Sequence, residues 1–401
     1  MKKLFLLLLP GLLFMGCSLD ADNPNNLLED QLDVRAFSPM VNGLEGVLVR
    51  AYGNILAPYS VASDEMIWIG SRDAWQQLNF GNVDNINNEF VDAAFFYVAE
   101  ARYWADDVIS RGEEFSTSNA FSSANKSDLV RAYWYGATIY MVIADMFDDF
   151  VVGSVKTEGT APVGAANMGS LYDTAVSYID KALALNSGLT SELKATKARA
   201  LFSKGIWTKT NPVNTASPLV SATSAVALAK EALAALGDDF SVNLITSGSA
   251  PDTVGGLDIA GEVNDRLEMR LSDAYIISTD AKRPDAYSDG DPSTTISLMD
   301  PIDNIADPAL FKLVANFTIA QLYPEHPIVS GREMHLIIAE DALSSGDNAT
   351  FTSHINKIRA LDGLSDYSGQ ISAQAMLEHS RSVNLFLQGR RIADHYRFGN
   401  P

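Results

Sequence analysis

The chain has 401 residues, with 29 lysines and arginines against 50 aspartates and glutamates, a formal net charge of −21 and a single cysteine. A surface this acidic repels phosphate backbones, so the charge argues against a nucleic-acid partner. One cysteine excludes an intramolecular disulfide framework and a zinc site built from several thiolates. The 47% share of hydrophobic residues is typical of a globular protein rather than a disordered one.

The first 16 residues have the pattern of a secretory leader. Lys2 and Lys3 precede an apolar run, Leu4 to Met15, that is too short to cross a bilayer. The run ends in Leu13-Phe14-Met15-Gly16-Cys17, which resembles a bacterial lipobox. We therefore predict that residues 1–16 are a lipoprotein signal peptide and that Cys17 is lipidated; an ordinary core cysteine is the alternative. The acidic stretch 17–30 would then be a solvated tether between the lipid and the body.

The body, residues 31–401, is predicted to be one mainly α-helical domain. Residues 91–110 are aromatic-rich and have no broad polar face. Residues 129–147 have no charged side chain between Arg131 and Asp145, which indicates a buried central helix. Helical periodicity continues over 171–185, from about 190, over 223–236, 332–343 and 351–361, and from 373 to about 396.

Several of these segments have small residues where two helices would meet. Ala195, Ala198, Phe202 and Gly205 fall on one face of the helix that begins near residue 190. Such helix pairs are typical of tetratricopeptide-like units, which bury their apolar faces against their neighbours. Between about 238 and 330 the composition turns to Ser, Thr, Gly, Asp and Pro, which predicts long irregular loops with a short hairpin among them.

The segment from Tyr59 to Asn88 contains the candidate ligand-binding residues. It has no clear periodicity, and it combines two indoles with hydrogen-bonding side chains. Exposed indole faces stack on apolar faces of sugars or peptides, and neighbouring polar groups orient the ligand. The predicted site consists of Trp68, Arg72, Asp73, Trp75, Gln76 and Asn79. Core packing is an equal alternative for Trp75 and the favoured one for Trp68, which lies in a continuous apolar run.

The sequence has no recognisable catalytic or cofactor motif. A phosphate-binding glycine loop, a His-Glu-x-x-His helix and a Gly-x-Ser-x-Gly elbow are all missing, and the five histidines are dispersed. The acidic run from Asp285 to Asp291 has oxygen ligands suited to calcium but lacks EF-hand spacing, so a solvated turn is favoured. We expect no enzyme activity, no cofactor and no metal.

Motifs spread over most of the chain resemble the SusD/RagB family of nutrient-uptake lipoproteins. After the lipobox come Leu19-Asp20 and Asn23-Pro24-Asn25-Asn26, then Arg131-Ala132-Tyr133-Trp134-Tyr135 and Met146-Phe147-Asp148-Asp149. The later matches are Arg332 to Ala342, Ile355-Asn356-Lys357-Ile358-Arg359, Arg381, and Gly389-Arg390-Arg391-Ile392-Ala393-Asp394. The chain departs from the family pattern at Gln388, where Glu is usual, and at Arg391, where an aromatic residue is usual.

The resemblance implies a SusD-like fold of tetratricopeptide-like helix pairs with long irregular loop insertions. It also implies a lipid-anchored protein of the outer membrane, at the cell surface, that captures oligosaccharide or peptide and passes it to a TonB-dependent transporter. The matched motif residues look structural, and we expect Arg390 and Asp394 to form an i, i+4 pair worth a few tenths of a kcal/mol. The alternative is a structural helix-repeat protein of an outer-membrane complex without its own small ligand; a surface hydrolase is a third reading.

Overall fold

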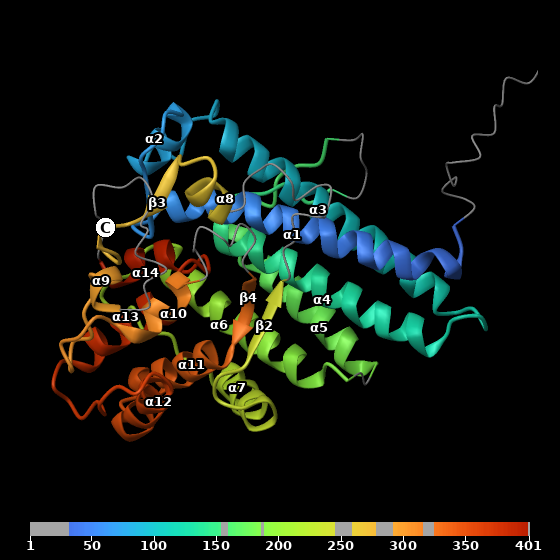
Figure 1. Ribbon diagram of the computed structural model, residues 1–401. Helices are drawn as coiled ribbons and strands as arrows, with labels where there is room; N and C mark the ends of the chain where they lie inside the picture. The colour runs from blue at the N-terminus through green and yellow to red at the C-terminus, as the bar shows by residue number, and fades with distance from the viewer. Residues whose placement is uncertain are drawn as a thin grey trace, which may run out of the picture.

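The structure is a computed structural model that describes residues 32–153, 159–185, 188–244, 259–277, 292–315 and 325–399. Helices make up most of it, and Figure 1 shows them packed side by side in one body. The proposed signal peptide, the tether with Cys17 and the acidic run 285–291 lie outside the described residues. The longer helices are α1 (Phe37–Ala62), α3 (Glu89–Phe115), α4 (Ser123–Met146), α5 (Ser170–Ala184), α6 (Thr190–Thr210), α7 (Thr223–Leu236), α11 (Gly331–Ser344), α12 (Asn348–Leu361) and α13 (Ala373–Asn384).

The N-terminal layer is formed by α1, α3 and α4. The side chain of Asn88 caps α3 by accepting from the N–H groups of Phe90 and Val91, and Ser122 and Asn125 form a capping box at the start of α4. Helix α4 packs against α1, α3 and α5, and every residue from Tyr135 to Ala144 is buried. The prediction of a buried central helix is therefore confirmed.

Antiparallel helix pairs continue the fold from α5 onward. Helix α6 packs against α5 and α7, and α11 packs against α7 and α12 (Figure 1). A small residue in α6 also lets the segment before α7 approach closely, because a Cβ at Gly205 would lie 2.5 Å from a methyl carbon of Val220. The predicted seam residues Ala195, Ala198 and Phe202 are all buried. The mainly α-helical, tetratricopeptide-like prediction is confirmed.

The region between about 238 and 330 has more order than the sequence indicated. Strand β2 (Ser241–Leu244) pairs antiparallel with β4 (His326–Ser330), so the two ends of the region lie side by side. Strand β1 (Met66–Trp68) pairs with β3 (Met269–Leu271) from inside it. The region also contains the short helices α8 (Ile259–Asn264), α9 (Pro292–Thr295) and α10 (Pro308–Val314). Its strands pair with distant partners, which a local hairpin prediction does not anticipate.

The predicted helix from 373 to 396 is two helices, α13 and α14 (Arg391–Phe398), separated by a bend. The bend contains left-handed φ values of 55° at Leu387 and 72° at Gly389. The N–H of Leu387 donates to Glu65 Oε1 at 2.8 Å, which ties the bend to the chain just after α1. Because this contact joins residues 322 positions apart, the local periodicity of the C-terminal segment gives no sign of it.

A buried network of charged side chains joins α14 to the helix pairs. Arg397 forms a bidentate pair with Glu340 of α11 and also donates to Asp394 Oδ1 at 2.9 Å. Asp394 Oδ2 accepts from Arg381 at 2.8 Å. The expected pair between Arg390 and Asp394 is wrong, because the guanidinium of Arg390 points to Glu333, with Nε 3.2 Å from Oε1.

A second part of this network joins α4, α5 and α6 to Arg390, the residue before α14. Arg199 Nη2 is 3.0 Å from Asp145 Oδ2, and Arg390 Nη1 is 3.7 Å from the same oxygen. The Tyr172 hydroxyl donates to Asp145 Oδ1 at 2.6 Å. In low dielectric each charge depends on its partners, since an unpaired buried charge is costly.

In the described residues, no helix is long and apolar enough to span a membrane.

Replacing Arg397 by Met should lower the free energy of unfolding by about 3–5 kcal/mol, because Glu340 then remains buried without its main partner. Urea denaturation measures the change. The matched control is Lys204→Met, since Lys204 pairs with Asp173 at the surface at 2.6 Å and such pairs contribute about 0–1 kcal/mol. Equal losses in the two variants would contradict a special role for the buried network.

Candidate functional site

The predicted ligand-binding segment folds as β1, a short connection and helix α2 (Asp73–Asn79). In β1, Trp68 lies opposite Met269 of β3. The backbone N–H of Trp68 donates to Asn79 Oδ1 at 2.9 Å, so the last residue of α2 is tied back to the strand. The side-chain oxygen of Asn79 therefore has a structural contact, and the strand and helix form one rigid corner.

The connection between β1 and α2 is held by Glu268. Its carboxylate accepts from the N–H groups of Ser71 at 2.9 Å and Arg72 at 3.0 Å, and from the Ser71 hydroxyl at 3.1 Å. Burial opposes the charged form of Glu268, but these hydrogen bonds outweigh it and lower its pKa. Gly70 leaves the space that this carboxylate occupies, because a Cβ there would lie 2.1 Å from Glu268 Oε2.

Trp75 points inward. Its side chain is 0% exposed and stacks on Phe90 of α3, with ring centroids 3.6 Å apart and an interplanar angle of 11°. Trp75 therefore belongs to the core, which is one of the two alternatives that the sequence left open, and it offers no face to a ligand. Trp68 is half-buried. Within the described residues, its indole nitrogen has no hydrogen-bond partner.

A buried carboxyl lies beneath α2. Glu262 of α8 is 0% exposed, with Arg266 Nη1 3.3 Å from its Oε1. In the described part of the chain, neither of its oxygens has a hydrogen bond of normal geometry, although the indole N–H of Trp75 is near enough to favour the charged form. Burial dominates over Arg266 and Arg72 and raises the pKa of Glu262 to about 7.

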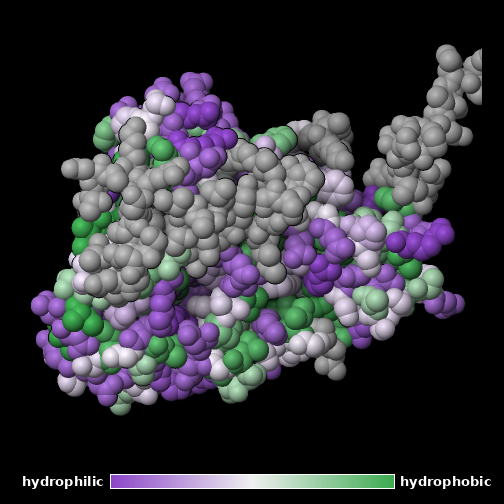
Figure 2. Space-filling view, viewed as in Figure 1, coloured by the Kyte–Doolittle hydropathy of each residue, from purple (hydrophilic) through white to green (hydrophobic). Residues whose placement is uncertain are grey.

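The outward face of α2 combines an aromatic ring with polar groups. Asp73, Gln76 and Phe80 follow one another at the i, i+3, i+7 spacing of one helical face. Phe80 is 73% exposed, Asp73 is exposed and Gln76 is half-buried. Arg72 is exposed beside this face, with Nη1 3.5 Å from Glu89 Oε1. Figure 2 shows this end of the molecule as mostly hydrophilic, with separate hydrophobic residues among polar ones.

Phe80 was missing from the predicted site. The predicted site consists of residues that are close along the chain and centres on the two tryptophans. Helical spacing from Asp73 would have pointed to Phe80 instead, because Trp75 lies on the opposite side of a helix that begins at Asp73. Arg72 and Asp73 are exposed and Gln76 is half-buried, so solvent reaches all three, as it reaches the ring of Phe80.

A second group of exposed aromatic residues lies on α3. Phe95, Phe96 and Trp104 are 40%, 62% and 39% exposed. Phe96 contacts Tyr97 edge to face at 5.3 Å, and the guanidinium of Arg50 lies over the Tyr97 ring at 4.6 Å. These aromatic residues are not among the binding residues predicted from the sequence. Phe95 and Phe96 are adjacent and form a second candidate surface for comparison with α2, whereas Trp104 lies nine residues on and about half a turn around the helix from Phe95.

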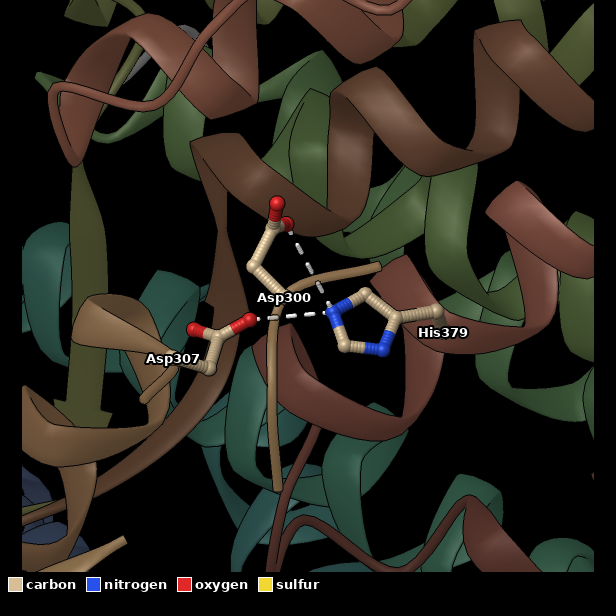
Figure 3. A group of neighbouring side chains, drawn as sticks. All are labelled: Asp300, Asp307 and His379. Atoms are coloured by element: carbon tan, nitrogen blue, oxygen red, sulfur yellow. Dashed lines mark hydrogen bonds and ion pairs between the residues drawn. The ribbon is translucent and has the colours of Figure 1, made fainter. Parts of the chain in front are cut away.

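Asp300, Asp307 and His379 meet in the interior, as Figure 3 shows. His379 Nε2 is 2.9 Å from Asp307 Oδ2 and 4.0 Å from Asp300 Oδ2. The donor set has the chemistry of a metal site, but Asp300 already receives both Arg359 amino groups, at 2.7 and 3.1 Å. A metal cation would have to displace or lie beside this guanidinium, so the group functions as a structural junction of the 300–307 loop with α12 and α13.

Comparison with known proteins identifies solved structures with a similar fold. No protein-family profile matches the sequence, and no curated protein matches it. Solved structures do match: a SusD superfamily protein from Bacteroides thetaiotaomicron VPI-5482 has a TM-score of 0.64 at 14% identity, with 92% of this chain and 89% of that one covered.

Two of the similar structures are described by their ligands. A SusD-like carbohydrate binding protein from Bacteroides vulgatus ATCC 8482 has a TM-score of 0.60 at 12% identity, over 91% of this chain and 83% of that one. A laminarin binding SusD-like protein has a TM-score of 0.54 at 12% identity, over 90% and 91%. The chain therefore has the SusD fold along most of its length, as the sequence motifs predicted.

Trp75→Ala should destabilise the protein by about 3–5 kcal/mol, because it leaves a large cavity against Phe90. Chemical denaturation measures the loss. The control is Trp104→Ala on the α3 surface, where we expect a loss below about 1 kcal/mol. A near-neutral Trp75→Ala variant would mean that the indole is not part of the core.

Glu262→Gln should stabilise the protein relative to wild type increasingly as the pH rises from about 4.5 to about 8. The folded-state pKa of about 7 exceeds the ordinary glutamate value of 4.5, so wild type loses stability as the pH rises through this window. The uncharged amide removes that loss. Unfolding curves at several pH values measure it, and a stability difference that stays constant between about pH 4.5 and 8 would contradict the prediction.

Proposed function

We propose that this chain is a non-catalytic, lipid-anchored glycan-binding protein of the bacterial outer membrane that delivers its ligand to a TonB-dependent transporter. The observation that supports it most is the SusD fold, matched over about nine-tenths of the chain by proteins described as carbohydrate binding or laminarin binding. The lipobox-like sequence around Cys17 supports the anchor and its location. Oligosaccharide is the favoured ligand class, with peptide as the second.

The ligand site is the outward face of α2. The ring of Phe80 would stack on the apolar face of a sugar, as aromatic rings do with C–H-rich surfaces. Arg72, Asp73 and Gln76 would orient its hydroxyls by hydrogen bonds, while Trp68 and Asn79 hold the corner on which the face is built. A site of this kind binds and releases without bond cleavage, which suits capture and transfer.

An assembly role without a small ligand is the alternative. The aromatic group on α3 supports it, because exposed aromatic side chains are enriched at protein interfaces. In that case the chain would remain with a barrel partner during purification, and a panel of glycans and peptides would show no binding.

Phe80→Ala should weaken glycan binding about tenfold or more, because it removes the stacking surface. Isothermal titration calorimetry against a panel of oligosaccharides and peptides measures the affinity. Phe96→Ala is the matched control, since this ring is similarly exposed but lies on α3.

The outcomes separate the readings. Loss of binding in Phe80→Ala alone supports the α2 site, whereas loss in Phe96→Ala alone moves the site to α3. Binding of peptides but not sugars changes the ligand class. No binding in wild type, with a helical spectrum intact, overturns the capture function and favours the assembly role.

A further inference from the structure

His335 of α11 and His354 of α12 contact each other where these two helices pack together. His335 Nδ1 lies 2.8 Å from His354 Nδ1, and the ring centroids are 5.1 Å apart at an angle of 47°. His335 is fully buried and His354 is half-buried, so the pair can be reached from solvent at His354. The five histidines are dispersed along the sequence, and spacing alone does not predict this contact because the two residues belong to different helices.

A carboxylate fixes the orientation and the tautomer of the buried ring. His335 Nε2 is 3.1 Å from Asp238 Oδ1, in the turn between α7 and β2. An ionised carboxylate only accepts hydrogen bonds, so Nε2 of His335 carries the proton and its Nδ1 has a free lone pair. His354 Nδ1 must then donate to it. A carboxylate behind one histidine is the usual support of a metal-ligating imidazole.

We propose that His335 and His354 bind one divalent transition-metal ion through their Nδ1 atoms, with Asp238 orienting His335 and water filling the remaining coordination positions. His354 takes up the other neutral tautomer on binding: its Nδ1 proton leaves, Nε2 gains one, and no net proton is released. The ion would clamp α11 to α12 and to the turn after α7. This site is independent of the proposed glycan site.

The two imidazole ligands favour particular ions. The observed 2.8 Å is a hydrogen-bond distance, so the rings must turn slightly for both Nδ1 lone pairs to point at one ion. Imidazole suits Zn²⁺, Cu²⁺ and Ni²⁺, and Cu²⁺ has the highest affinity in the divalent series. We therefore expect Cu²⁺ to bind more tightly than Ni²⁺ or Zn²⁺.

Groups around the histidine pair both favour and oppose the binding of a cation. Burial lowers the pKa of both imidazoles and so favours the neutral form that a metal binds. Lys357 Nζ lies 3.5 Å from Asp238 Oδ1, and Lys357 and Lys230 both lower the pKa of His354 by their positive charge. The same lysines repel a metal cation. Removing the charge of Lys357 should therefore strengthen binding, whereas loss of a merely structural contact would not.

The test is calorimetric titration of the full chain with Ni²⁺ at pH 7.5. Wild type should bind, His354→Gln should bind at least tenfold more weakly, and Lys357→Gln should bind at least twofold more tightly. His379→Gln is the matched control, because it removes the histidine of the Asp300–Asp307–His379 group instead. Cys17 is present in every variant, so differences among them report the histidines.

Each result decides the proposal. Equal affinities in wild type and His354→Gln, loss of binding only in His379→Gln, or no binding of Ni²⁺ or Cu²⁺ below 1 mM would each overturn it. A rise in the melting temperature with Ni²⁺ in wild type, absent in His354→Gln while both proteins have the same helical spectrum, would support the clamp.

Discussion

The fold depends on buried ion pairs that hold the C-terminal segment against the helix pairs. Arg381 and Arg397 share Asp394 and Glu340, while Arg390 points to Glu333 of α11 and toward Asp145 of α4. These helices come from distant parts of the chain. Because each buried charge is costly when unpaired, the ion pairs favour the packing that keeps opposite charges together. The apolar seams between the helices stabilise the packing, and the ion pairs align the helices with one another.

The same need for partners positions the α2 corner. Glu268, the residue before β3, accepts from the backbone at Ser71 and Arg72, and Asn79 accepts from the backbone of Trp68. With the corner held at both ends, Trp75 packs on Phe90 and the opposite helical face is left to solvent. A rigid support of this kind lets a short helix present an aromatic ring and polar groups at low entropic cost.

The helices that the sequence predicted best are those with strong local signals. The uncharged stretch before Asp145 defined α4, and the seam of small residues defined α6. Predictions failed where a distant partner decided the local conformation. The bend at Leu387 depends on Glu65, and the strands within 238–330 depend on partners at its far end or in β1. Periodicity contains no information about such partners.

The sequence by itself determined the mainly α-helical class, the helix pairs and the SusD-like order of motifs, because hydrophobic spacing and small residues at seams are local properties. The tertiary structure alone decided which side chains face solvent. It turned Trp75 inward, exposed Phe80, gave Arg390 a partner other than Asp394 and joined His335 to His354 across two helices. Exposure and cross-helix contact depend on how whole elements pack, and no single segment contains that information.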